Sequence, residues 1–181
     1  MIIAQEKRKK NIAEFILYMW QVEDLIRASG FDLERVNETV ISRFDLPEEM
    51  LAEIRTWYSN LITLMAEERI VSRGHMSFLN QLIRELNDLH LRLLQSPSEE
   101  KYQQLYRDAR PNIKSLTGKS PDTFSSEIEA CLTGLYGTLL LRLKQAEIST
   151  ETQAAVASFS NLLAALSTRF REIEEGSKEL P

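Results

Sequence analysis

The sequence predicts an all-α fold: a single-domain, antiparallel bundle of six or seven helices, with the first long helix at its centre. Only 6 Gly and 5 Pro occur in 181 residues, which leaves few places for the turns of a strand-rich fold. Apolar residues recur at helical spacing along most of the chain, and no segment alternates for long enough to predict a strand. We expect residues 1–175 to form one helical domain and residues 176–181 to form a frayed tail.

Four helices are expected in the first half of the chain, and cap and breaker residues set their limits. They cover approximately residues 4–29, 32–44, 47–68 and 75–95. The first helix is apolar around most of its circumference, which is why it should be central, and Gly30 is well placed as its C-terminal cap. Pro47 suits the first turn of the third helix, and SRGH at 72–75 predicts a turn before the fourth.

Three more helices are expected in the second half. One begins after Ser98, although Pro111 should break or kink it. The other two cover about residues 123–146 and 148–175, and TGKSPD at 117–122 is the one conspicuous loop.

Three of the expected helices carry a polar residue inside an apolar stripe. Because each helical residue advances by about 100°, Glu23 falls within the apolar face of the first helix, His90 within that of the fourth and Arg142 within that of the sixth. Burying any one of them alone would cost several kcal/mol, so polar groups in a core are normally paired. We therefore predict one shared polar cluster, buried or semi-buried, in which Glu23 bonds Arg142, His90 or both. Arg27, one turn after Glu23, is an alternative partner.

Two interpretations of this cluster remain open. In the first, a purely structural network fixes the register of the helices. In the second, the cluster floors a ligand pocket with Trp20 and Tyr136 near enough to form its walls, and its arginine and histidine would favour a small anionic ligand. Gly134 and Gly137, opposite the stripe that contains Arg142, should let another helix pack closely.

Motifs for catalysis, metal binding or cofactor binding are poorly represented. Neither His75 nor His90 stands in the Glu-x-x-His spacing of a di-iron bundle, and TGKS at 117–120 lacks the rest of a phosphate-binding loop. Cys131, the single cysteine, lies on an apolar stripe and should be a small buried hydrophobe. We therefore predict no metal and no cofactor, and we favour a non-enzyme while leaving enzymatic activity open.

Charge and hydropathy indicate a cytoplasmic protein. A net charge of −5 and a pI near 5.2 argue against nucleic acid as a partner, because such binding usually needs a basic face. The basic and then apolar N-terminus superficially resembles a secretory signal, but Glu14 interrupts its apolar run. No uncharged apolar run reaches the roughly 18 residues that a membrane span needs, so we expect no membrane association.

Three stretches of the chain are distinctive: NIAEFILYMWQVEDLIRA at 11–28, DLHLRLL at 88–94 and EIEACLTGLYGTLLLRL at 127–143. Together they resemble an uncharacterised all-helical family, a domain of unknown function found chiefly in Bacteroidetes, and the resemblance extends over nearly the whole chain. It implies a helical fold and no particular activity. The same stretches contain the residues of the predicted polar cluster.

The leading functional interpretation is a non-catalytic interaction or structural module, whose partner is a second copy in a homodimer or another protein. The chain offers apolar helix faces and acidic surfaces but no recognisable reaction apparatus. The alternative is a binding protein or enzyme that takes a small anionic ligand in a pocket floored by Glu23, His90 and Arg142.

Overall fold

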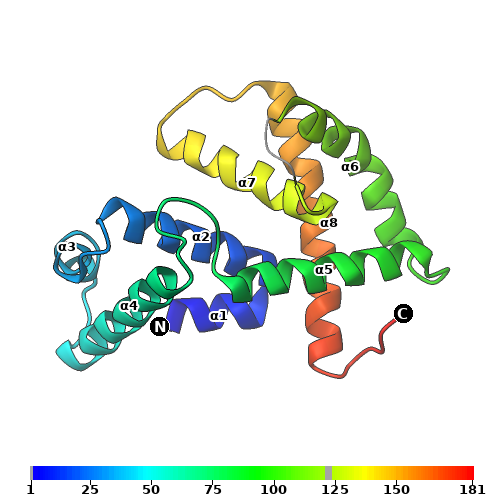
Figure 1. Cartoon of the computed structure of the whole chain (residues 1–181). Coiled ribbons are helices and arrows are strands. Elements are labelled where there is room, and N and C mark those ends of the chain that lie inside the picture. Colours follow the sequence, from blue (N-terminus) through cyan, green and yellow to red (C-terminus); the bar gives the residue numbers. More distant parts are fainter. Residues whose placement is uncertain (1, 121–123) are drawn as a thin grey trace. The chain divides into compact units, whose positions relative to one another are not determined.

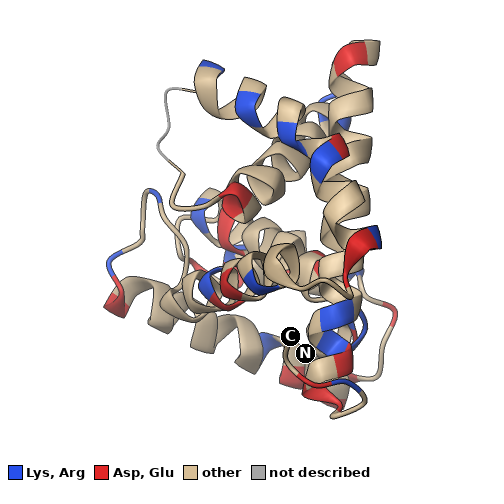
Figure 2. Cartoon of the chain, turned by 90° about the vertical axis from the view of Figure 1, so that its right-hand side faces the viewer, with Lys and Arg blue, Asp and Glu red and all other residues tan. Residues whose placement is uncertain are grey.

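The structure, a computed structural model, describes residues 2–120 and 124–181 (Figure 1). The described residues form eight α-helices and one short 3-10 turn, with no strand among them, which confirms the predicted all-α class. None of the described helices is both long and apolar enough to cross a bilayer. Basic and acidic residues are interspersed along the helices (Figure 2).

The helices follow one another with short connections. Their bounds are α1 (Ile2–Lys10), α2 (Ile12–Ala28), α3 (Leu33–Thr39), the 3-10 turn η1 (Ile41–Arg43), α4 (Glu48–Glu67), α5 (Ser77–Gln95), α6 (Glu100–Lys119), α7 (Glu127–Leu143) and α8 (Thr150–Glu174). The number exceeds the predicted six or seven because the first expected helix is interrupted at Asn11, which is not helical. An asparagine side chain competes with the backbone for hydrogen bonds, so it is poorly suited to a helix interior.

The chain divides by its contacts into two compact units. Unit 1 contains Met1–Arg8 and Glu14–Asn80, and unit 2 contains Lys9–Ala13 and Gln81–Pro181. Helix α5 therefore begins in unit 1 and continues in unit 2. The expectation of a single domain stays a prediction.

In unit 1 the long apolar helix α2 ends where the sequence predicts. Gly30 has a φ of +68°, and its N–H donates to the carbonyl of Arg27 at 3.0 Å, which closes the last turn. Asp32 then caps α3 by accepting from the backbone N–H groups of Glu34 and Arg35. Apolar side chains from α2, α3, η1, α4 and the start of α5 are buried: Phe15, Ile16, Met19, Trp20, Val22, Ile26, Val36, Ile41, Ile54, Tyr58, Leu61, Met65, Met76 and Leu79.

In unit 2 the helices α6, α7 and α8 pack against one another (Figure 1). Of the two effects expected of Pro111, a break or a kink, the break is wrong, since α6 continues through it to Lys119. Pro111 is exposed, while Ala109 and Ile113 on either side of it are buried and hold the helix against its neighbours. The predicted loop at 117–122 is therefore helical at its start, and residues 121–123 lie outside the described residues.

Two glycines in α7 play different parts, although the sequence predicts close helix packing for both. A Cβ on Gly134 would lie 2.9 Å from Cε2 of Phe159 and 3.2 Å from Cδ2 of Leu116, so that the prediction is confirmed there. A Cβ on Gly137 would meet nothing within 4 Å, so close packing does not explain this glycine. A glycine in a helix interior costs about 1 kcal/mol relative to alanine, and only Gly134 has a packing reason for it.

These two glycines give a matched pair of substitutions in one helix. We expect Gly134→Ala to destabilise the protein by about 1–3 kcal/mol, because the added methyl overpacks against Phe159. Gly137→Ala should instead stabilise it, by up to about 1 kcal/mol, because only helix propensity changes. Urea unfolding followed by circular dichroism measures both free energies. Equal effects of the two substitutions would contradict the assignment.

Candidate functional site

The fully buried carboxylate of Glu23 is bonded to the segment that leads into α5. Its Oε2 atom lies 2.5 Å from Nδ1 of His75, and its Oε1 atom accepts from the backbone N–H of Met76 at 2.7 Å. Both donors stand at the N-terminal end of α5, where free N–H groups and the helix dipole favour a negative charge. The predicted burial of Glu23 is therefore confirmed, and its partners are His75 and Met76.

The ring of His75 is fixed on two sides. It stacks on the buried indole of Trp20, with ring centroids 4.3 Å apart and an interplanar angle of 16°. Its Nδ1 atom donates to the carboxylate of Glu23, because a carboxylate oxygen only accepts hydrogen bonds. The side chain is 30% exposed, and the backbone carbonyl of His75 accepts from the amide of Asn80 at 2.9 Å.

Arg27, one turn after Glu23 on α2, binds the same segment. Its guanidinium donates to the backbone carbonyls of Ile70 and Gly74 and also to the carboxylate of Asp24 at 3.0 Å. Its bonds to these carbonyls replace the pairing with Glu23 that the sequence left open. Glu23 and Arg27, on consecutive turns of α2, thus both bind the connection between α4 and α5, residues 68–76.

Unit 2 contains a second buried polar residue, His90. Its Nδ1 atom lies 2.7 Å from the hydroxyl of Tyr102, and its Nε2 atom lies 3.7 Å from Oε2 of Glu127. The ring of Tyr106 approaches its edge, with centroids 5.1 Å apart. Burial lowers the pKa of His90, and the carboxylate of Glu127 partly opposes this, while burial raises the pKa of Tyr102. Both pKa shifts favour the neutral forms, so a neutral imidazole accepts a hydrogen bond from the neutral Tyr102 hydroxyl.

Arg142 does not lie in the core, and the prediction that it does is wrong. It is exposed in the last turn of α7, where a positive charge complements the helix dipole. Leu141 and Leu143 beside it are 42% and 69% exposed, so this end of α7 is apolar on its solvent side as well. A helical wheel cannot identify the inward face of such a segment. Tyr136, the expected pocket wall on the same helix, is half-buried.

The predicted residues therefore fall into separate groups. Glu23 and Trp20 contact His75 in unit 1, and Arg27 binds the carbonyls of Ile70 and Gly74 in the same segment, whereas His90 has its partner Tyr102 in unit 2. Glu23 is hydrogen-bonded within unit 1 and Nδ1 of His90 within unit 2, whereas the buried Nε2 atom of His90 has no hydrogen-bond partner among the described residues. The shared cluster of Glu23 and His90 stays a prediction. His75 is the residue of this group that the sequence does not indicate, because SRGH at 72–75 predicts only a turn. A buried acid needs hydrogen-bond donors, and a turn that begins a helix offers free N–H groups and a positive dipole end. Considering these two features together could have indicated His75.

No metal centre is found among the described residues, since they contain no group of three or more His, Cys, Asp or Glu side chains that could hold an ion. Cys131 is fully buried, as predicted, and burial raises the pKa of its thiol to about 12. A thiol of this kind stays protonated near neutral pH and is a poor nucleophile.

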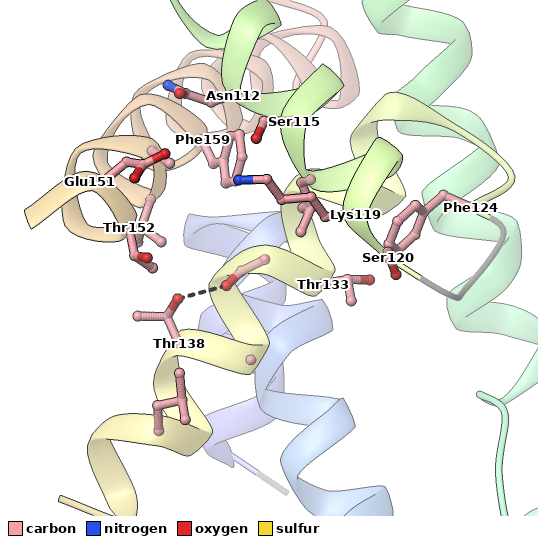
Figure 3. Close-up of a pocket in the computed structure, with 16 residues that line it drawn as sticks. Asn112, Ser115, Lys119, Ser120, Phe124, Thr133, Thr138, Glu151, Thr152 and Phe159 are labelled. Atoms are coloured by element: carbon pink, nitrogen blue, oxygen red, sulfur yellow. Dashed lines mark hydrogen bonds between the residues drawn. The ribbon is translucent and has the colours of Figure 1, made fainter. Parts of the chain in front are cut away.

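A cavity of about 380 Å³ lies between α6, α7 and the start of α8, within unit 2 (Figure 3). Sixteen residues line it: Asn112, Ser115, Leu116, Lys119, Ser120, Phe124, Thr133, Gly134, Gly137, Thr138, Leu141, Glu151, Thr152, Ala155, Val156 and Phe159. The predicted site residues are not among them. The lining contains both hydroxyl-bearing and apolar side chains. The hydroxyl of Thr138 donates to the carbonyl of Gly134 at 2.9 Å (Figure 3).

The buried carboxylate gives a stability prediction. Glu23→Gln keeps the shape of the side chain but places an amide where two donors, the Nδ1–H of His75 and the N–H of Met76, need acceptors. We expect a loss of about 3 kcal/mol in the free energy of unfolding. Glu14→Gln is the control, because Glu14 is exposed on the same helix and should change stability by less than about 1 kcal/mol. Similar losses in the two variants would show that Glu23 needs no charge.

His90 gives a prediction about pH. Because burial lowers its pKa in the folded protein, the unfolded chain takes up this proton first as the pH falls below about 6.5. The free energy of unfolding should therefore decrease between pH 7 and pH 5, with His90 contributing up to about 1 kcal/mol per pH unit. His90→Asn should flatten this dependence, as measured by urea unfolding at a series of pH values. A slope unchanged by the substitution would contradict the neutral, buried state of His90.

Comparison with known proteins identifies a family and no activity. No curated protein and no solved structure matches the chain significantly. The model of a family described as a domain of unknown function, DUF4924, matches residues 1–177. The match covers almost the full length of the sequence, so the chain belongs to the DUF4924 family.

Proposed function

We propose that this chain is a non-catalytic binding module, whose cavity between α6, α7 and α8 takes a small and largely apolar ligand. The main support for the proposal is the open space beside Gly137. This glycine lines the cavity, a Cβ built on it meets nothing within 4 Å, and its cost in helix stability has no packing explanation. A larger side chain at this position would narrow the cavity, which explains a glycine there.

The size and lining of the cavity support this proposal. Ligand sites in proteins usually have volumes of about 300–1,000 Å³ and apolar walls with a few polar groups. The volume here, about 380 Å³, suits a ligand of modest size. Leu116, Phe124, Val156 and Phe159 supply apolar surface, and the lining also contains hydroxyl-bearing side chains.

Binding without catalysis is favoured by the chemistry of the wall. The residues that line the cavity include neither histidine nor cysteine, which most often act as base or nucleophile near neutral pH. The imidazole of His75 faces Glu23 in unit 1, and that of His90 is buried against Tyr102. The small anionic ligand expected from the sequence would have used Arg142, which does not line the cavity.

A pair of leucine substitutions tests the proposal. Gly137→Leu should fill the cavity, whereas Gly118→Leu places the same side chain on α6 at a helical glycine that does not line it and also has nothing within 4 Å. We expect N-phenyl-1-naphthylamine, an uncharged fluorescent probe, to bind the wild type saturably. Its affinity should fall about tenfold or more in Gly137→Leu, a loss of about 1.4 kcal/mol, and stay unchanged in Gly118→Leu.

Thermal melting of both variants shows whether they remain folded. The proposal is overturned if the wild type shows no saturable binding, or if the probe binds both folded variants as well as the wild type.

A further inference from the structure

We infer that the cavity is selective for a zwitterion with an apolar body, the chemistry of an α-amino acid with a large aromatic or aliphatic side chain. This inference rests on the proposed function of the cavity. Its basis is the pair of charged residues among those that line it, the cation Lys119 and the anion Glu151.

The two charges come from helix ends on different walls of the cavity. Lys119 is the last residue of α6, and Glu151 stands in the first turn of α8 (Figure 3). Both are exposed, and no ion pair joins them among the contacts of the described residues. Each sign complements the dipole of its own helix, which explains it locally. The packing of α6 against α8 nevertheless brings opposite charges to one cavity.

Charge complementarity decides between classes of ligand. A simple anion would be attracted by Lys119 and repelled by Glu151, and a simple cation would meet the reverse. A zwitterion offers its carboxylate to Lys119 and its ammonium group to Glu151, and both hydrogen bonds are charge-assisted. The neighbouring hydroxyls of Ser115, on α6, and Thr152, on α8, can donate to the carboxylate and accept from the ammonium group.

The cavity offers apolar surface that the apolar part of such a ligand can contact. Phe124 and Phe159 line the cavity together with Leu116 and Val156, so an aromatic or branched side chain would replace water there. The open space beside Gly137 lies in the same cavity, which leaves room for a side chain larger than a methyl group.

Calorimetric titration of the full chain tests this selectivity with three related compounds. L-phenylalanine carries both charges, phenethylamine lacks the carboxylate, and 3-phenylpropionate lacks the ammonium group. We expect phenylalanine to bind most tightly, by about threefold or more over each analogue, since exposed charge pairs contribute modestly.

Charge-removing variants locate the effect. Lys119→Gln should weaken the binding of phenylalanine and leave that of phenethylamine no weaker. Glu151→Gln should weaken the binding of phenylalanine and leave that of 3-phenylpropionate no weaker. Lys114→Gln, on the exposed side of α6 and outside the cavity lining, is the control and should change nothing.

Failure of this inference is distinct from failure of the proposed function. If the uncharged probe binds and Gly137→Leu removes it, the cavity is a ligand site. The zwitterion inference alone is then overturned when phenylalanine binds no better than its two analogues, or when Lys119→Gln and Glu151→Gln leave its affinity unchanged. If the uncharged probe and phenylalanine both fail to bind, both proposals are overturned.

Discussion

A single buried charge constrains the structure of unit 1. The carboxylate of Glu23 has no contact with water, so the protein must supply every hydrogen bond that solvent would have given. It obtains them from His75 and Met76, which can reach it only if the connection between α4 and α5 lies against α2. Removing this carboxylate would leave the donors of His75 and Met76, at the start of α5, unsatisfied. The stacking of His75 on Trp20 and the bonds from Arg27 to the carbonyls of Ile70 and Gly74 complete the same arrangement.

Much of the fold could be predicted from the sequence, because helix periodicity and cap residues are local signals. The burial of Glu23, His90 and Cys131 follows from their places on apolar stripes. Their partners could not be found in this way, since a helical wheel gives the direction of a side chain but not which donors lie opposite. Arg142 shows a further limit: α7 is apolar on more than one face near its end, so its inward side cannot be read from periodicity.

The candidate binding site could not be located from the sequence either. Gly134 and Gly137 look equivalent there, three residues apart in one apolar helix, yet one is packed under Phe159 and the other borders open space. The most conspicuous polar residues proved to have structural partners, while the cavity is lined by ordinary hydroxyl and apolar side chains. The buried carboxylate of Glu23 and the cavity proposed as a binding site thus belong to different units of the chain.

The central claim is that Glu23 holds the start of α5 through the N–H of Met76. Amide hydrogen exchange at this position, measured by NMR in the wild type and in Glu23→Ala, tests it most directly. We expect slow exchange of the Met76 amide in the wild type and much faster exchange in the variant, with a smaller change at the Leu86 amide in the interior of α5. A Met76 amide that exchanges in the wild type as fast as an exposed, unbonded amide would contradict the account.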